Sequence, residues 1–196
     1  RLPEVALDGV ALRVLIGSCP AAAPPAAPYA RPPGRDDRRK GADALRTHGL
    51  RMLAQDPDEW PHLLVLLGDQ VYADEPSPVV ERRMRRRRRR ARSRARSGHA
   101  DRLPPEDVAG NFEEYTWLYQ EAWTPEVERW VLSVVPSTMI FDDHDMIDDW
   151  NISASWVRDI RGTSWWSEHV IGGLVSYWVH QHLGNLSPAR LRDEGL

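Results

Sequence analysis

The clearest hydrophobic pattern along the chain is the unbroken apolar run Leu63–Leu67, which Gly68 ends. A run without a polar face is typical of a strand that is covered on both sides, so it predicts a buried strand. A second run, Val10–Cys19, is rich in leucine and β-branched residues and predicts another strand. Between the two, Asp43–Gln55 has the apolar spacing of an amphipathic helix. Strand, helix and strand in this order predict a right-handed crossover between parallel strands, and therefore an α/β fold.

The second half of the chain is predicted to be mainly helical. Two helices are expected at Phe112–Ala122 and Pro125–Leu132, followed by a short apolar strand at Thr138–Phe141. A last helix is expected at Trp165–Leu183, with one apolar stripe that consists of Val170, Leu174 and Trp178. Most of the nine tryptophans lie in this half, so it must bury substantial aromatic area.

Length and composition favour one domain with a sizeable core, because the chain has 196 residues and 41% hydrophobic residues. The single cysteine, Cys19, excludes an intrachain disulfide and a cysteine-cluster zinc site. No stretch reaches transmembrane length and no signal peptide opens the sequence. The location therefore stays open: cytoplasmic if the beginning is near-native, exported if a signal precedes it. Since the sequence starts at Arg1 rather than Met, we expect a piece of a longer protein.

Two low-complexity segments interrupt the pattern. Residues 20–40 open with six prolines and six alanines up to Pro33, which predicts an extended surface loop. Residues 81–100 form an arginine-rich insertion, with eleven arginines and no acid in 82–96. Without these arginines the net charge of −3 becomes −14, so the body is acidic. The tract could contact nucleic acid or an anionic membrane, but a solvated inserted loop is the preferred interpretation, because no aromatic residues interleave for base stacking.

Polar side chains follow each of the predicted strands. Asp69, Tyr72 and Asp74 come just after the buried strand, and Cys19 ends the first one. Ligands of open α/β sheets gather at the carboxyl ends of strands, so Asp69 is placed to hold a metal ion. The alternative is that Asp69 only caps a following helix or turn. If the two strands are neighbours, the Cys19 and Asp69 side chains could reach one ion.

A third group follows the strand at Thr138–Phe141, because five of the eight residues in 142–149 are aspartates. So many carboxylates stay ionised together only where a cation compensates them, which favours a metal site at Asp142 and Asp143. The loop lacks the central glycine and terminal glutamate of an EF-hand. Asp148 and Asp149 are interpreted instead as a solvated turn that caps a helix. Beside metal-binding carboxylates, His144 could donate a proton to a leaving alkoxide or hydrogen-bond a phosphoryl oxygen.

Three motifs in this order resemble the PhoD-like alkaline phosphatases of the metallophosphoesterase superfamily: G-S-C at 17–19, G-D-Q-V-Y at 68–72 and F-D-D-H-D at 141–145. The resemblance implies a fold of packed sheets flanked by helices, and a site that pairs Fe³⁺ with Ca²⁺. It assigns metal-ligand positions to Cys19, Asp69, Tyr72 and Asp143, and the acidic cluster adds Asp142 to the metal candidates. It matches His144 to the substrate-facing histidine and Asn151 to a phosphate-binding asparagine. The family also takes ligands from a Gly-Asp and histidine motif further downstream, so we expect this chain to carry only part of the site.

The chemistry of the residues agrees with a ferric ion, since cysteine, aspartate and tyrosine supply three anionic ligand types. Free tyrosine and cysteine have pKa values of about 10 and about 8.5, so only a highly charged metal keeps both deprotonated at neutral pH. The expected function is hydrolysis of small phosphate esters by a metal-activated hydroxide, with His144 assisting the leaving group. No nucleic-acid partner is expected. The alternatives are a non-catalytic module that binds anions or nucleic acid through the arginines, and an inactive paralogue.

Overall fold

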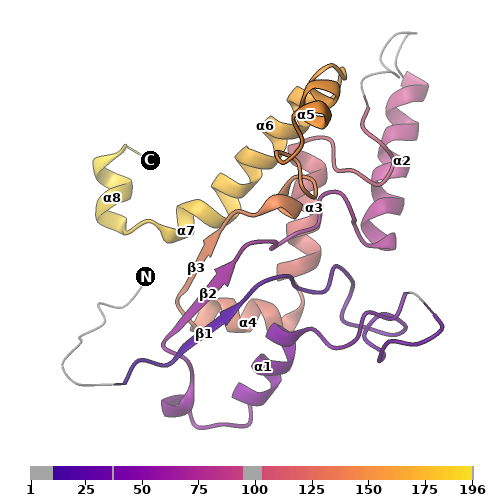
Figure 1. The fold of residues 1–196 in the computed structure, drawn as a ribbon. Helices are drawn as coiled ribbons and strands as arrows, with labels where there is room; N and C mark the ends of the chain where they lie inside the picture. Colours follow the sequence, from indigo (N-terminus) through magenta and orange to yellow (C-terminus); the bar gives the residue numbers. More distant parts are fainter. Residues whose placement is uncertain (1–10, 37, 95–102, 196) are drawn as a thin grey trace.

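The computed structural model describes residues 11–36, 38–94 and 103–195, and the fold in these ranges is mixed α/β (Figure 1). Three parallel strands form one sheet in the order β1 (Val14–Gly17), β2 (Leu63–Leu67) and β3 (Ser137–Ile140). The predicted buried strand is confirmed with its predicted bounds, and so is the parallel crossover to the first strand. Because all three strands are parallel, their carboxyl ends lie side by side at one edge of the sheet.

One face of the sheet carries the core. Helices α1 (Ala44–Met52) and α4 (Glu126–Val134) pack on Leu64 and Leu66 of β2 and on Met139 of β3. The N-terminus of α1 is capped by the Asp43 side chain, which accepts a hydrogen bond from the Arg46 amide at 2.9 Å. Such a cap supplies an acceptor to one of the unpaired amides of the first turn.

The opposite face of the sheet is open in the described ranges. Ile16 of β1 is 62% exposed and Ile140 of β3 is 51% exposed, and Leu67 also faces solvent. The prediction that Leu63–Leu67 is covered on both sides is therefore wrong for the part of the chain described. A continuous apolar run shows that a strand prefers burial on both faces, but it does not supply the second layer.

A second helical layer lies beside the sheet and is built around α3 (Phe112–Trp123), which contacts both α2 (Pro78–Arg94) and α6 (Trp166–Tyr177) (Figure 1). Its core contains Tyr115, Leu118 and Tyr119. The remaining elements are η1 (Pro57–Glu59), η3 (Asp143–Asp145), α5 (Ala154–Arg161), η4 (Trp178–His182), α7 (Leu183–Asn185) and α8 (Pro188–Asp193). None of the helices in these ranges combines the length and the apolar character that a membrane crossing requires.

The predicted last helix, Trp165–Leu183, is divided into α6, the π-helical turn η4 and α7. Two residues of its apolar stripe, Leu174 and Trp178, are exposed, and only Val170 packs against a core cluster. The buried face of α6 begins with Trp166 and continues with small and polar residues: His169, Gly172, Gly173 and Ser176. The reason is close packing, because a Cβ at Gly172 would lie 2.9 Å from the Phe112 amide nitrogen at the start of α3.

Most of the arginine-rich tract is helical, so the prediction of a solvated inserted loop over 81–100 is wrong as far as Arg94. The rest of that segment, 95–100, lies outside the described residues. Two side chains of α2, Val80 and Met84, belong to the core that α3 shares. The tract is therefore part of the fold and not an addition to its surface.

The like charges of α2 are compensated by acids of the same chain. Arg88 is buried, and its guanidinium forms two hydrogen bonds with the Glu114 carboxylate of α3, at 2.6 and 3.0 Å. Arg87 pairs with Glu113 at 2.7 Å, one residue earlier on α3. A dense run of arginines can order when acidic residues face it, and here α3 provides them.

The segment 20–40 contains no helix or strand among its described residues, as expected for an extended loop. One hydrogen bond ties its beginning to the start of α1, because the Ala21 amide donates to the Asp43 carboxylate at 2.9 Å. A second bond closes the loop on itself, since the Lys40 amide donates to the Tyr29 carbonyl at 2.8 Å.

Candidate metal centre at the strand ends

The first two strands end in residues that face each other across the sheet. The Cys19 thiol lies 3.4 Å from a carboxylate oxygen of Asp69, although the two residues are 50 positions apart. Both residues have left-handed backbone, with φ of 54° and 50°. This conformation costs about 1–2 kcal/mol for a residue with a Cβ, and such strain is typical of functional sites.

The ends of β2 and β3 are in close contact because Gly68 has no side chain. Its φ of +88° is in the left-handed region, and a Cβ there would lie 2.3 Å from the Asp142 Cβ. The glycine thus brings the loop after β2 against the loop after β3. This approach places Asp69 beside Asp143 and His144.

Asp69, Asp143 and His144 form the centre of the site, since each offers a ligand atom within 4.8 Å of the other two. The His144 amide donates to the Asp69 carboxylate at 3.3 Å and to the Asp143 carboxylate at 3.1 Å. Burial raises the pKa of Asp69, and the negative charges of Asp142 and Asp143 add to this, against a hydrogen bond from Cys19. The pKa of Asp143 is lowered, mainly by the hydrogen bond from the Asp149 amide. A cation between these carboxylates would remove their repulsion.

Tyr72 borders the same centre from the loop after β2. Its ring centroid lies 4.8 Å from that of His144. Burial raises the pKa of Tyr72, and the neighbouring Cys19 and Asp69 raise it further. The phenol therefore stays protonated at neutral pH in the absence of a cation, and it could serve as an anionic ligand only to a strongly charged metal.

Asp74 orients His144, a role that the sequence did not indicate. Its Oδ1 accepts a hydrogen bond from His144 Nδ1 at 2.9 Å, and its Oδ2 accepts one from the Asp148 amide at 2.7 Å. Burial opposes protonation of His144, but the hydrogen bond and charge of Asp74, with Asp69 and Asp148, raise its pKa overall. The sequence placed Asp74 near the site as a further oxygen donor, and only the tertiary structure shows its partner.

Asp145 joins the loop after β2 to the loop after β3 from a buried position beneath the site. It is buried, and its carboxylate accepts hydrogen bonds from the Asp142 amide at 3.1 Å, the Val71 amide at 3.4 Å and the Gln181 side chain at 3.1 Å. Burial raises its pKa to about 7, against the lowering effect of these hydrogen bonds. A sequence signal existed, since Asp142 and Asp145 have the spacing of a capping box and form one.

Two further predicted site residues lie differently. Asp142 is exposed, and its carboxylate caps the 3₁₀ turn η3 by accepting the Asp143 amide at 3.0 Å. Asn151 is exposed and lines a separate hollow with Trp150 and Arg161, into which none of the ligand candidates projects. The structure therefore brings Cys19, Asp69, Tyr72, Asp143 and His144 together, and it leaves Asn151 outside this group.

The helix-capping role expected of Asp148 and Asp149 is wrong, because Ser153 caps α5 by accepting the Trp156 amide at 3.3 Å. Both aspartates are exposed and form a second acidic group with Asp143, again within 4.8 Å. The Asp149 backbone is left-handed, with φ of 55°. Its amide donates to the Asp143 carboxylate at 2.9 Å, so this turn supports Asp143 and does not start a helix.

Comparison with protein-family models, curated proteins and solved structures gives no match to this chain.

Proposed function

We propose that this chain carries part of the active site of a metal-dependent phosphoesterase. The observation that supports the proposal best is the meeting of Asp69, Asp143 and His144 within 4.8 Å at the carboxyl ends of parallel strands. The carboxyl ends of such strands are the usual place of ligands in α/β sheets. The motifs at 17–19, 68–72 and 141–145, which resemble PhoD-like phosphatases, contain the ligand candidates that meet or border this centre. They extend the proposal to a metallophosphoesterase-type fold.

The donor set fits a trivalent and a divalent cation. Cys19, Tyr72 and Asp69 would hold Fe³⁺, because a thiolate, a phenolate and a carboxylate together suit a highly charged ion. Asp143 and the exposed Asp142 would contribute to the neighbouring Ca²⁺ position, since calcium prefers carboxylate oxygens. When bound, such ions polarise phosphoryl oxygens and lower the pKa of water.

Residues of this chain would carry out the proton transfer and hold the site in place. Asp74 holds His144 through Nδ1 at 2.9 Å, so the proton on Nε2 is available to a leaving alkoxide or a phosphoryl oxygen. The raised pKa of His144 keeps more of the protonated form at neutral pH. Asp145 and Gly68 keep the two acidic loops at the separation that the centre requires.

The test uses the full-length protein, stripped of metal and then titrated with Fe³⁺. We expect a visible charge-transfer band that is lost or shifted in Tyr72→Phe and kept in the matched control Tyr29→Phe, whose ring lies in the 20–40 loop. We expect His144→Ala to keep the band and to lower hydrolysis of p-nitrophenyl phosphate by about 10²- to 10⁴-fold. A colourless iron-loaded protein, or His144→Ala with the parent rate, would refute the proposed roles.

A further inference from the structure

Helix α2 has two sharply different sides. Val80, Met84 and Arg88 are buried against α3. The arginines on the other side are exposed and form no ion pair with any described carboxylate; they are Arg82, Arg86, Arg89, Arg90 and Arg92. Because the buried side fixes the helix in the fold, the exposed guanidinium groups are held in a defined arrangement before any partner arrives.

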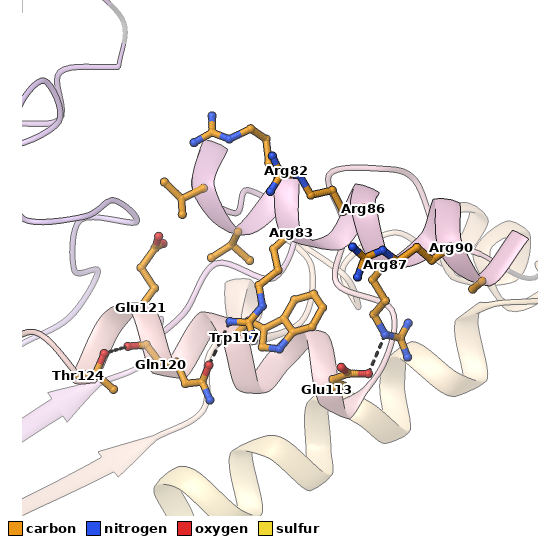
Figure 2. A pocket seen from close by; sticks show the side chains of 13 residues that line it. Arg82, Arg83, Arg86, Arg87, Arg90, Glu113, Trp117, Gln120, Glu121 and Thr124 are labelled. Atoms are coloured by element: carbon orange, nitrogen blue, oxygen red, sulfur yellow. Dashed lines mark hydrogen bonds and ion pairs between the residues drawn. The ribbon is translucent and has the colours of Figure 1, made fainter. Parts of the chain in front are cut away.

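Part of this exposed side faces a groove of about 1100 Å³ between α2 and α3 (Figure 2). The α2 wall carries five arginines: Arg82, Arg83, Arg86, Arg87 and Arg90. The α3 wall carries two carboxylates, Glu113 and Glu121, with Gln120 and Thr124. Five cations against two anions leave an excess of three positive charges in the groove.

The acids and the aromatic ring of the groove already have partners. Glu113 pairs with Arg87 at 2.7 Å, and Glu121 accepts a hydrogen bond from Ser77 at 2.7 Å. The guanidinium of Arg83 lies 4.2 Å over the ring of Trp117, which is largely buried. Arg82, Arg86 and Arg90 are therefore the cations of the groove that a ligand could engage without displacing another contact.

We propose that this groove binds an acidic polypeptide segment, whose carboxylates pair with Arg82, Arg86 and Arg90. These residues are four apart on the helix, so the side chains start about 6 Å apart along its axis. Carboxylates on every second residue of an extended peptide have a similar spacing of about 6.6 Å. Val79, which is 41% exposed, lines the same groove and offers a contact for an apolar side chain of the segment.

The groove suits a peptide better than nucleic acid or a membrane. Single-stranded nucleic acid needs free aromatic faces for its bases, and Trp117 is already covered by Arg83. The carboxylates of the α3 wall would also meet a phosphodiester, which carries charge on every unit, whereas a peptide can turn neutral groups toward them. A membrane-binding helix requires an exposed apolar face, and the apolar side of α2 is buried against α3.

Fluorescence anisotropy tests the proposal with a labelled 14-residue peptide in which Glu or Asp alternates with neutral residues. We expect saturable binding at 150 mM salt, and none to a peptide with Gln and Asn in place of the acids. Arg86→Gln with Arg90→Gln should raise the Kd of the peptide about 5- to 25-fold, because loss of one exposed ion pair raises Kd by a factor of up to about five. The matched control Arg89→Gln with Arg92→Gln removes two charges from the same helix outside the groove. It should change affinity less than about twofold, since screening weakens distant charges at this salt concentration.

Three results would overturn the proposal. The first is an equal loss of affinity in both double variants, which would show long-range attraction without a groove. The second is tighter binding of a 20-nucleotide single strand, a 20-base-pair duplex or phosphatidylserine vesicles than of the acidic peptide. The third is the absence of saturable peptide binding. None of these measurements uses hydrolysis, so they are independent of the proposed phosphoesterase activity.

Discussion

Replacement of Arg88 by methionine should destabilise the protein strongly. The Arg88 side chain is 4% exposed and that of Glu114 is 1% exposed, and two hydrogen bonds of 2.6 and 3.0 Å join them. Arg88 also donates to the Val108 carbonyl at 2.6 Å and to the Pro105 carbonyl at 2.8 Å. Loss of one member of a buried ion pair costs about 3–5 kcal/mol, because the other charge stays buried without its partner.

The size of this effect can be compared with total stability. A native domain is stable by about 5–15 kcal/mol, so Arg88→Met should remove at least about a fifth of it, and all of it at the lower end of that range. Part of the loss should be recovered in the double variant Arg88→Met with Glu114→Gln. Glutamine removes the stranded charge and keeps an acceptor for the Gly110 amide, which now donates to Glu114 at 2.9 Å. We expect the double variant to be about 1.5–3 kcal/mol more stable than the sum of the single effects predicts.

Urea unfolding followed by tryptophan fluorescence measures these differences, and the nine tryptophans give a strong signal. Arg86→Met serves as the control, because it removes an exposed arginine of the same helix and should change stability by less than about 0.5 kcal/mol. If Arg88→Met unfolds within about 1 kcal/mol of the parent protein, the pair does not hold α2 to α3 and the reasoning is wrong.

Three further predictions concern pH, backbone and catalysis. Burial lowers the pKa of His169 from 6.5 to about 4, so the unfolded chain binds a proton at this residue first as pH falls. His169 should therefore remove about 2 kcal/mol of stability from pH 7 to pH 5, against the opposite contribution of Asp145, whose pKa is raised to about 7. In urea titrations at each pH, the stability of the parent relative to His169→Gln should fall by this amount over that range. Gly68→Ala should lower the free energy of unfolding by at least about 1–2 kcal/mol, measured by thermal unfolding, and should weaken metal binding, because the added methyl group would meet Asp142. Unchanged metal affinity would contradict the tight contact of the two loops. Asp74→Asn should lower kcat on phosphate esters about 10- to 100-fold. It should also move the alkaline limb of the pH–rate profile to lower pH, because His144 loses the charge that raises its pKa. A variant with the same pH profile as the parent protein would exclude this positioning role.

Local patterns predicted the elements and the position of the site well. The apolar run at Leu63–Leu67 has the bounds of β2, and Gly68, whose φ is +88°, follows its last residue directly. The first strand is shorter than its sequence pattern: β1 begins at Val14, which pairs with Leu63, the first residue of β2, while Val10 lies outside the described residues. A strand can extend only as far as its neighbour, and a single sequence does not show that limit.

The arginine-rich tract shows what charge counting misses. The density of like charges predicts repulsion unless acidic residues face the tract. Glu113 and Glu114 of α3 face it, and each is 26 residues from its arginine partner in the sequence. For the same reason the residues 82–96 should not be removable without loss of stability, since Met84 and Arg88 belong to the core. The partnership of Asp74 with His144 was hidden in the same way, because 70 residues separate them.

The order of the strands has a consequence for how the centre forms during folding. Its members come from three loops, with 50 residues between Cys19 and Asp69 and 75 between Asp69 and His144. Contacts of such high sequence separation form late, because each needs a long loop to close first. No short segment of the chain can then present the centre, and a cation would bind the native state but not partly folded forms. A cation at a free concentration of 100 times its Kd would therefore stabilise the finished fold by about 2.7 kcal/mol, and its binding would report the last tertiary contacts to form.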